Sequence, residues 1–563
     1  MSKLVQQATN ELREAIEAAI KVAIADGSLP EAEIPAFALE VPADRSHGDW
    51  ACNAAMAGAR AFRLAPRKIA EAVVSHLDLT PTYFDRCEIA DPGFLNFFLN
   101  PRFYADVLRD VEALGEQYGR SDYGKGEKVM VEFVSANPTG PMHMGNARGG
   151  ALGDCLAAVL DAAGYDVWRE FYVNDAGNQI EKFGVSLEAR YLQIYKGEDA
   201  IELPEDGYHG DDIREHAQNY ANEFGDKLLA VSPEERRAAL VQYALPKNIA
   251  RMQRDLEKYR IHYDRWFLES TLHEDGELNE VVEILKNKGL TYEKEGALWY
   301  RATDFGAEKD EVLIRQNGNP TYFTADIAYH RNKFNRGFTR LIDVWGADHH
   351  GHVARMKGAM DAIGMDGSKL DVVLIQLVRL VRAGEVVRMS KRSGKAIQLA
   401  DLLDEVPIDA ARFLFNMREA NTQMDFDLDL AVQQDSQNPV YYVQYAHARI
   451  CSLFQKLAGE GLTLRPCTDE ELALLNKPEE IELLRHIASY TDEIVAAAKG
   501  YDPARITRYV ITLANLFHSF YNACRIGGEE DSLAHARLQL CAAVLTVIRN
   551  VLRMFNITAP ERM

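Results

Sequence analysis

The sequence lacks the features that mark several common classes of protein. It has no apolar stretch long enough to cross a membrane, and its first segment reads as an amphipathic helix without the apolar core and cleavage site of a signal peptide. The seven cysteines are scattered without a CxxC pair, which disfavours both a disulfide framework and a cysteine-based zinc site. We therefore expect a cytoplasmic protein with no membrane partner and no protein-bound metal.

Two common phosphate-binding patterns are also missing. Neither the GxxxxGK[ST] pattern of P-loop proteins nor the GxGxxG pattern of dinucleotide-binding folds occurs in the chain. The net charge of −22 is weak evidence against a nucleic-acid partner, because contacts to phosphates supply most of the affinity for nucleic acids. The charge does not exclude such a partner, since a local basic face is sufficient.

The pattern of apolar residues divides the 563-residue chain into three predicted domains. Residues 1–105 are predicted to form an αβ domain with a first helix, a long second helical stretch and a closing strand, GFLNFFL. Residues 120–405 alternate strands and helices, as in a doubly wound parallel sheet of the Rossmann type, with insertions near 197–260 and 290–322. Residues 406–563 are predicted to form an all-helical domain, because apolar residues recur there at helical spacing.

The most informative segment is a predicted strand, Lys128–Val134, followed by the turn SANPTGPM and by HMGN, which opens a helix of small residues. A helix N-terminus presents free N–H groups and about half a positive charge, which suits a phosphate. His143 and Asn146 would lie on the ligand side of the first turn as hydrogen-bond donors, and Gly145 would let a ligand approach closely. The alternative is a glycine-rich helix packed on a sheet, and HxGN alone favours that alternative.

A second segment, RMSKR at Arg388–Arg392, supplies the opposing cations that a polyphosphate requires. HMGN and RMSKR together resemble the HIGH and KMSKS signatures of class I aminoacyl-tRNA synthetases. The resemblance is more specific for arginyl-tRNA synthetases and covers essentially the whole chain. The matching stretches are residues 131–154, Tyr172–Ile180, Asp264–Ser270, Thr321–His330, Trp345–His352, Ile408–Phe415, Tyr441–Ile450 and the C-terminal Ala559–Met563.

Two positions depart from the class signatures. Asn146 replaces the last histidine of HIGH and remains a neutral donor, and Arg388 replaces the first lysine of KMSKS with a cation that does not deprotonate. Many members of the family lack the KMSK lysine and carry a lysine just before HIGH instead. This chain has Lys391 and, at the upstream position, Gly140, which is the complementary pattern.

The resemblance implies which residues bind arginine. Glu269 and Asp326, together with Tyr322, would hold the guanidinium, whose five N–H donors require carboxylates. The family match assigns the α-amino and α-carboxylate end, and contacts to the amino acid near it, to Glu132, Ser135, Asn137 and His349. Each acid has an alternative interpretation as a surface or helix-capping carboxylate, and Glu132 has a further one as a structural residue.

The resemblance also implies a two-step ligation that uses ATP. The arginine carboxylate would attack the α-phosphorus to give arginyl-adenylate and pyrophosphate, and the terminal ribose of the tRNA would then take the arginyl group. Mg²⁺ is expected on the phosphates, without a dedicated protein site, and activation is expected to require bound tRNA. The implied catalytic residues are His143, Asn146, Arg388 and Lys391, and further ATP contacts come from Gly145, Gly346, Asp348, Met389 and Ser390.

The helical C-terminal domain is expected to bind the anticodon region of tRNA(Arg). Aromatic and cationic side chains suit splayed bases, and those at the start of this domain are Tyr441, Tyr442, Tyr445, His447 and Arg449. For Tyr442 and Tyr445 a place in the helix core is an equally good interpretation. The N-terminal domain resembles the family's additional domain, which contacts the outer corner of tRNA.

Three rival functions remain open. A class I-like ligase that passes an activated amino acid to a small acceptor would not need the two terminal domains, and a non-catalytic tRNA-binding paralogue would have lost the phosphate-binding residues. A metal site on the Asp348–His352 cluster, which would allow a hydrolase, lacks further cysteine or histidine partners at ligand spacing. We expect a monomer that binds arginine, ATP and tRNA and does not bind DNA.

Overall fold

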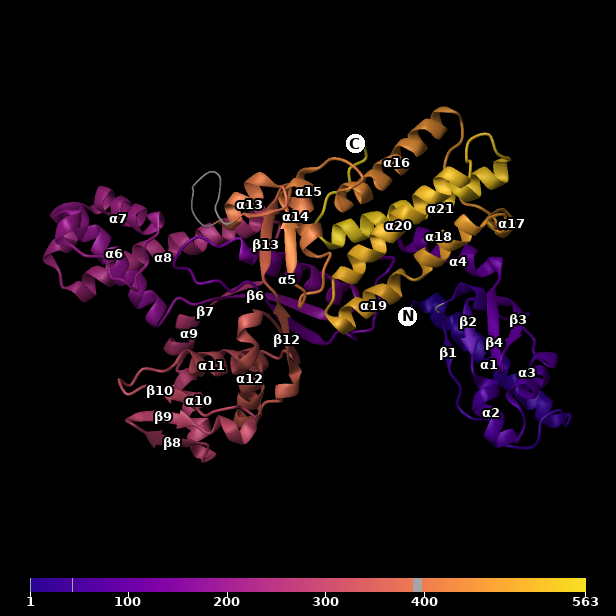
Figure 1. Cartoon of the computed structure of the whole chain (residues 1–563), viewed down its shortest axis with the longest axis horizontal. Coiled ribbons are helices and arrows are strands. Elements are labelled where there is room, and N and C mark those ends of the chain that lie inside the picture. Colours follow the sequence, from indigo (N-terminus) through magenta and orange to yellow (C-terminus); the bar gives the residue numbers. More distant parts are fainter. Residues whose placement is uncertain (1, 43, 388–396) are drawn as a thin grey trace.

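The computed structural model describes residues 2–42, 44–387 and 397–563. The chain is elongated, with the N-terminal module at one end of the long axis and a helical insertion at the other (Figure 1). The N-terminal module packs helices α1 (Lys3–Ala25), α2 (Ala54–Phe62) and α3 (Pro66–Ser75) on an antiparallel sheet. Its strands, in the spatial order β1-β2-β4-β3, are β1 (Leu39–Glu40), β2 (Trp50–Cys52), β3 (Phe84–Ala90) and β4 (Phe94–Leu99).

The single long second helix expected in this module is instead two helices. Arg63 adopts a left-handed conformation with φ of 53° at the end of α2, and Pro66 starts α3 at its first position. A left-handed residue followed by proline ends a helix and begins another, because proline suits the first turn and not the interior. Helix α4 (Pro101–Leu114) then leads out of the module and packs on the C-terminal helices.

A five-stranded parallel sheet forms the centre of the molecule. Its order is β12-β11-β5-β6-β7, which confirms the doubly wound fold expected from the sequence. Four of the five residues of β5 are buried, as expected for a strand covered on both faces. The strands are β5 (Lys128–Glu132), β6 (Asp166–Val173), β7 (Arg265–Leu268), β11 (Arg340–Gly346) and β12 (Leu370–Ile375), and helices α5 (Gly145–Ala162), α11 (Tyr322–Asn335) and α12 (His350–Ile363) flank them.

Two insertions interrupt the alternation. The first packs α6 (Asn178–Lys196), α7 (Asp211–Phe224) and α8 (Pro233–Lys258) around a small core of its own and extends away from the sheet (Figure 1). The second adds α9 (Glu269–Glu274), α10 (Glu277–Asn287) and an antiparallel sheet. The strands of that sheet are β8 (Thr291–Lys294), β9 (Ala297–Tyr300) and β10 (Glu311–Ile314).

A small mixed sheet joins the central domain to the C-terminal helices. Strand β13 (Val378–Arg382) pairs with β14 (Glu385–Val387) on one side and with β15 (Met424–Asp427) on the other. Between the first two strands and the third lie α13 (Leu399–Glu405) and α14 (Ile408–Phe415), and α15 (Leu428–Val432) follows. The second signature segment therefore comes directly after β14.

The C-terminal region is helical, as expected. Its helices are α16 (Pro439–Gly459), α17 (Asp469–Leu472), α18 (Pro478–Ala488), α19 (Tyr490–Gly500), α20 (Ala504–Ala523) and α21 (Asp531–Met554). By length and composition α21 is apolar enough to cross a membrane, so the expectation that no such stretch exists was wrong for this helix. Its apolar window is 67% buried, against α4, α16 and α20 among others, which is the environment of a core helix.

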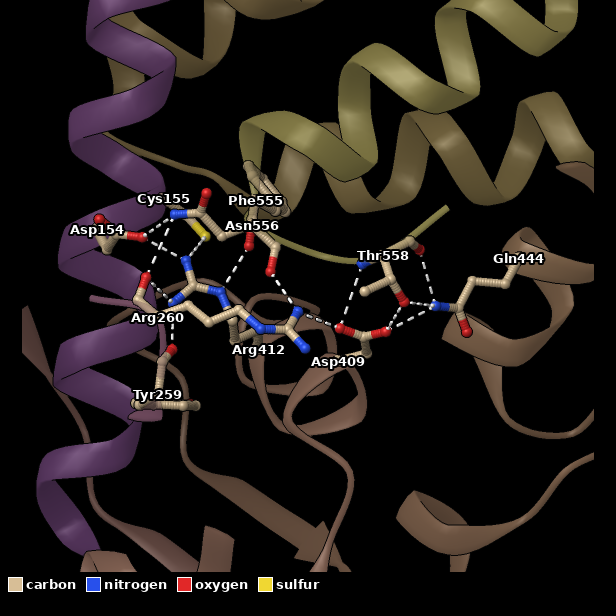
Figure 2. A network of polar contacts seen from close by, with 10 residues as sticks. All are labelled: Asp154, Cys155, Tyr259, Arg260, Asp409, Arg412, Gln444, Phe555, Asn556 and Thr558. Carbon is tan, nitrogen blue, oxygen red and sulfur yellow. Dashed lines mark hydrogen bonds and ion pairs between the residues drawn. The ribbon is translucent and has the colours of Figure 1, made fainter. Parts of the chain in front are cut away.

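A buried polar network joins α5 to the C-terminal helices (Figure 2). Arg412 on α14 is fully buried and forms an ion pair with Asp154 on α5. Its other donors bind the carbonyl oxygens of Phe555 at 2.6 Å and Tyr259 at 2.9 Å. A buried charge requires such partners, because removal from water costs several kcal/mol. The network thus fixes α5, the end of α8 and the end of α21 against α14.

Arg412→Ala is expected to destabilise the protein by about 3–5 kcal/mol, because it leaves Asp154 buried without its closest cation. The measurement is the shift of the urea unfolding midpoint. Arg379→Ala is the matched control, since Arg379 pairs with Asp425 at 2.7 Å on the surface and its loss should cost less than about 1 kcal/mol. Equal shifts for the two variants would contradict this account of the network.

Candidate active site

A cavity of about 580 Å³ opens at the carboxyl edge of the parallel sheet. Open α/β sheets bind ligands at this edge, where the strand order reverses. Here β5 is the strand between the two halves of the sheet. The cavity brings together seven of the residues predicted from the sequence, namely Glu132, Ser135, Asn137, Asp326, Gly346, Asp348 and His349.

The chain turns sharply as it leaves β5 for this cavity. Val134 and Ser135 have φ of 70° and 40°, which is an uncommon conformation for any residue with a side chain and especially for a β-branched one. The Ser135 hydroxyl holds the turn, since it donates to Glu132 Oε1 at 2.8 Å and accepts from the N–H of Tyr172 at 3.1 Å. Strain of this kind is concentrated at functional sites.

Glu132 belongs to a buried network that the sequence did not reveal. Lys333 on α11 is fully buried, and its Nζ lies 2.5 Å from Glu132 Oε2 and 2.8 Å from Asp343 Oδ1. His330 Nε2 lies 2.6 Å from the other oxygen of Asp343. Burial alone would raise the pKa of Asp343, but Lys333 and His330 outweigh burial and lower that pKa to about 2. These contacts favour the structural interpretation of Glu132.

Asp326 lies on the wall of the cavity, on the second turn of α11. Its Oδ2 is 3.0 Å from His352 Nε2, and its side chain remains 35% exposed. The Trp345 ring lies against that of His352, with 5.4 Å between the ring centroids. A carboxylate oriented by a histidine and still open to the cavity can accept hydrogen bonds from a cationic ligand.

Glu269 and Tyr322 lie in a neighbouring cavity of about 310 Å³. Tyr322 and Asp326 are four residues apart on α11 and therefore share a face of that helix. Glu269 is only 3% exposed. Burial raises the pKa of its carboxyl above the ordinary value of 4.5, and the charge of Asp326 adds to the rise. The predicted guanidinium ligands thus line two neighbouring cavities, with Tyr322 and Asp326 on α11 and Glu269 at the start of α9.

His143 lies at the exposed start of α5. Its Nδ1 accepts a hydrogen bond from the N–H of Gly145 at 3.1 Å, which leaves the proton of the neutral ring on Nε2 as a donor. Asn146 follows in the first turn of the helix. The N–H groups of Gly145, Asn146 and Ala147 already bond to His143 Nδ1 and to the carbonyl oxygens of His143 and Met144. This end of the helix therefore offers an anion the imidazole Nε2, the Asn146 side chain and the positive end of the helix dipole.

A third cavity, of about 520 Å³, contains His143. It lies between the signature turn and the first insertion and is also lined by Asp212, Arg251 and Gln398. Asn137 lines both this cavity and the first one, so the two meet at the turn. The structure therefore places His143 in a cavity that shares the lining residue Asn137 with the first cavity.

Arg388, Met389, Ser390 and Lys391 lie outside the described residues. The segment that follows them forms two backbone hydrogen bonds with the residues around His143. Met144 N–H donates to Ile397 O at 3.0 Å, and Leu399 N–H donates to Met142 O at 2.9 Å. Gln398 and His143 form an antiparallel bridge between these two bonds. Residues 397–399 are thus paired directly with the HMGN segment.

A separate cavity of about 260 Å³ opens on the C-terminal helices. It is lined by Tyr441, Tyr442, Tyr445 and Arg449 on α16 and by His518 on α20, which the sequence analysis missed. Tyr445 is 40% exposed, which argues against a place in the core. Burial and the nearby Arg449 lower the pKa of His518 to about 4, so that its ring is neutral at physiological pH.

His447 does not join the other residues of this cavity. It is fully buried, and its Nδ1 lies 2.8 Å from the carbonyl oxygen of Pro560. The prediction that His447 contacts tRNA is therefore corrected: it is a core residue that ties α16 to the C-terminal segment. In helical spacing it lies on the opposite face from Tyr445, which is two residues away.

Comparisons with known proteins agree along the whole chain. Three family models match: the arginyl tRNA synthetase N terminal domain at residues 10–99, the class I (R) tRNA synthetase catalytic domain at 110–451, and the DALR anticodon binding domain at 443–563. The chain belongs to the arginyl-tRNA synthetase family. The arginine–tRNA ligase of Acetivibrio thermocellus is 55% identical over 564 residues, which is 100% of both chains.

Two further relatives support the family and the fold. The arginine–tRNA ligase of Caldanaerobacter subterraneus subsp. tengcongensis is also 55% identical over 564 residues, with 100% of both chains covered. The arginyl-tRNA synthetase of Thermus thermophilus superposes with a TM-score of 0.70 at 22% identity, over 98% of this chain and 100% of that one. At that identity the likeness supports the fold alone.

The Asp348–His352 cluster does not form a metal site in the part of the chain that is described. His352 is paired with Asp326, and the His349 side chain is 60% exposed with Asp348 as its ionic neighbour at 3.5 Å. Among residues 2–42, 44–387 and 397–563, no group of three or more histidine, cysteine or acidic side chains is arranged to hold a metal ion. The cluster instead lines the first cavity.

Lys333→Met is expected to lower the melting temperature, and the loss should be larger at about pH 8 than at about pH 5. In the native protein the depressed pKa of Asp343 contributes stability above the pKa of the unfolded state, and this contribution is lost as the pH falls toward 2. Without Lys333, burial raises the pKa of the Glu132 and Asp343 carboxyls. Protonation at mildly acidic pH then removes their buried charges and reduces the destabilisation of the variant. Thermal unfolding of both proteins at the two pH values tests this. A loss that does not change with pH would contradict it.

Proposed function

We propose that this chain attaches L-arginine to tRNA(Arg) through arginyl-adenylate, with release of AMP and pyrophosphate. The observation that carries the proposal is the junction at Asn137, where an acid-lined cavity meets the cavity that holds His143 at the edge of one sheet. The full-length similarity to arginine–tRNA ligases supports the same activity. The domain limits 1–105, 120–405 and 406–563 are part of this proposal.

Arginine binding would use one acid from α9 and one from α11. The guanidinium fork would lie between Glu269 and Asp326, with the Tyr322 hydroxyl and ring beside it, and Ser135, Asn137 and His349 would face the α-amino and carboxylate end. A ligand without this fork would leave desolvated carboxylates unpaired, which costs several kcal/mol and gives strong specificity. The role of Glu132 would be indirect, because Lys333 and Ser135 already occupy its oxygens.

ATP use follows from the class I catalytic domain. The triphosphate would lie over the start of α5, where the Nε2 of His143 and the side-chain amide of Asn146 would donate to phosphate oxygens. Gly346, Asp348 and Gly145 would contact the nucleotide, and Arg388, Met389, Ser390 and Lys391 would approach from the second signature. Mg²⁺ on the phosphates would neutralise charge. Catalysis would come from positioning and from these donors, since no side-chain nucleophile is needed.

The C-terminal cavity would receive unstacked bases of the anticodon loop. Tyr441, Tyr442 and Tyr445 offer stacking surfaces, and Arg449 supplies the positive charge that a phosphate or a base edge requires. His518 would act as a neutral ring in this cavity. A monomeric state, a cytoplasmic location and a requirement for tRNA during activation complete the proposal.

Two rival activities make different predictions from this one. A ligase that serves a small acceptor would leave the C-terminal aromatic cavity without a use, and a non-catalytic paralogue would not retain His143 and Asn146 at the start of α5. The cavity and the helix start therefore favour a synthetase that acts on tRNA.

ATP–pyrophosphate exchange with each of the amino acids, with and without tRNA, tests the proposed function. Exchange is expected with arginine only and only when tRNA is present. Exchange with a different amino acid, or none with arginine and tRNA, would overturn the proposal. Tyr445→Ala serves as a specificity control, because it should weaken tRNA binding without changing which amino acid is used.

The affinity for arginine is expected to fall as the pH is lowered through the raised pKa of Glu269. The cationic guanidinium binds the ionised carboxylate, so each proton taken up by Glu269 competes with arginine. Glu269→Gln should reduce the affinity by roughly 10- to 100-fold and remove most of this pH dependence. Calorimetric titration of both proteins between about pH 4 and pH 8 measures this pH dependence.

The control is Glu181→Gln, which changes an exposed acid in the same cavity and should bind arginine like the original protein. A pH dependence that is the same in Glu269→Gln would disprove the assignment.

A further inference from the structure

Helix α8 of the first insertion contacts the turn before HMGN and the segment at Gln398 that is paired with HMGN. Asn248 is only 3% exposed, and its Nδ2 donates to the carbonyl oxygen of Pro138, inside the SANPTGPM turn, at 3.0 Å. One turn further along the same face, Arg251 donates to Gln398 Oε1 at 3.1 Å. Residues three positions apart on a helix lie side by side, so adjacent side chains of α8 hold the turn before HMGN and the segment paired with it.

We propose that Asn248 and Arg251 are positioning residues, which set the turn at Pro138 and the segment at Gln398 relative to each other so that both can act on one triphosphate. The proposal rests on the function proposed above. Neither residue is among the arginine-binding or phosphate-binding residues predicted from the sequence, and Arg251 lines the cavity of His143 while its guanidinium is bonded to Gln398. Their effect on catalysis would be exerted through Pro138 and Gln398.

Asn248 is held in the orientation that this role requires. His216 Nε2 on α7 lies 2.7 Å from Asn248 Oδ1, so the oxygen of the amide faces the insertion and the nitrogen faces Pro138. The carbonyl of Pro138 belongs to a turn, where no ladder of backbone bonds constrains it. A buried donor that satisfies such a carbonyl fixes the turn, because leaving the carbonyl without a partner in the interior is unfavourable.

Gln398 is a junction of several bonds. Its backbone forms the bridge to His143, and its side chain caps α13 together with Asp401. The guanidinium of Arg251 adds a third constraint from α8. With its register fixed by three different elements, the segment has one position relative to His143.

The far end of α8 is anchored in the network of Figure 2. Arg260, two residues after the helix ends, donates to Asp409 at 2.5 Å and to the carbonyl oxygen of Asn556 at 2.8 Å. The backbone carbonyl of Tyr259 accepts from Arg412. Lys258 also pairs with Asp404 on α13, in the helix that Gln398 caps. Helix α8 is therefore fixed to α13 and α14 at its end, and side chains from its C-terminal half bind Pro138 and Gln398.

The test is the kinetics of arginine-dependent ATP–pyrophosphate exchange in the full-length protein with tRNA. Asn248→Asp keeps the shape and the acceptor for His216 but removes the donor to Pro138, and Arg251→Ala removes the donor to Gln398. Both are expected to lower kcat by about 10- to 100-fold, since small displacements of reacting groups cost rates of that order. The KM for arginine should change by less than about threefold, because the proposed guanidinium ligands lie on α9 and α11 and not on α8. Arg251→Lys, which keeps a donor, should recover most of the rate.

Arg254→Ala is the matched control, because Arg254 is an exposed arginine one turn beyond Arg251 on the same helix. A double-variant cycle separates positioning from direct contact with the substrate: in a Gln398→Ala background, Arg251→Ala should cost less than about threefold. Melting temperatures of all variants identify any that fail to fold. If Arg251→Ala is one of them, the kinetics of Arg251→Lys are used instead.

Several outcomes would overturn the inference. They are a kcat within twofold of the original protein for Asn248→Asp and Arg251→Ala, a loss that appears in the KM for arginine instead, or a full cost of Arg251→Ala in the Gln398→Ala background. If the original protein and Arg254→Ala both fail to exchange with arginine, the proposed function has failed and not the role of α8.

Discussion

Two backbone hydrogen bonds hold the candidate site together, one from Met144 to Ile397 and one from Leu399 to Met142. They pair the start of the phosphate-binding helix with the segment that follows the second signature, which comes from a distant part of the sequence. An antiparallel bridge of this kind fixes register as well as distance, since a shift by one residue would turn His143 and Gln398 to the other side. Every chemical role proposed for the two signatures depends on this pairing.

The surroundings of the bridge are held by buried charges, each with several partners. Lys333 joins Glu132 to Asp343 beneath the first cavity, and Arg412 joins α5 to the end of α21. Such groups contribute little net stability when fully paired, but they penalise any other arrangement strongly, because displacement leaves a buried charge alone. Because breaking these pairs is costly, the edge of the sheet is held rigid. Catalysis by positioning requires such rigidity.

Local sequence patterns predicted the strand and helix that form the site. They did not predict the contacts between residues that are far apart in the sequence. Strand β5 and helix α5 follow from periodicity and glycine placement within about thirty residues, which a single sequence contains. The partnership of Lys333 with Glu132 spans 201 residues, so no local pattern indicates it. His447 and His518 show the same limit, because both are histidines on amphipathic helices and only the packing decides that the first is buried and the second lines a cavity. The break between α2 and α3 has a local signal in the sequence, because Pro66 favours the first turn of a new helix.

The most direct test of the central claim is a crystal structure of the protein with tRNA and a non-hydrolysable ATP analogue. The account predicts that the analogue's phosphates lie over the start of α5, within hydrogen-bonding distance of His143 Nε2 on one side and of the Lys391 ammonium on the other, with the pairing of residues 142–144 and 397–399 intact. Phosphates bound away from His143, or bound at α5 with Lys391 turned to solvent, would contradict it.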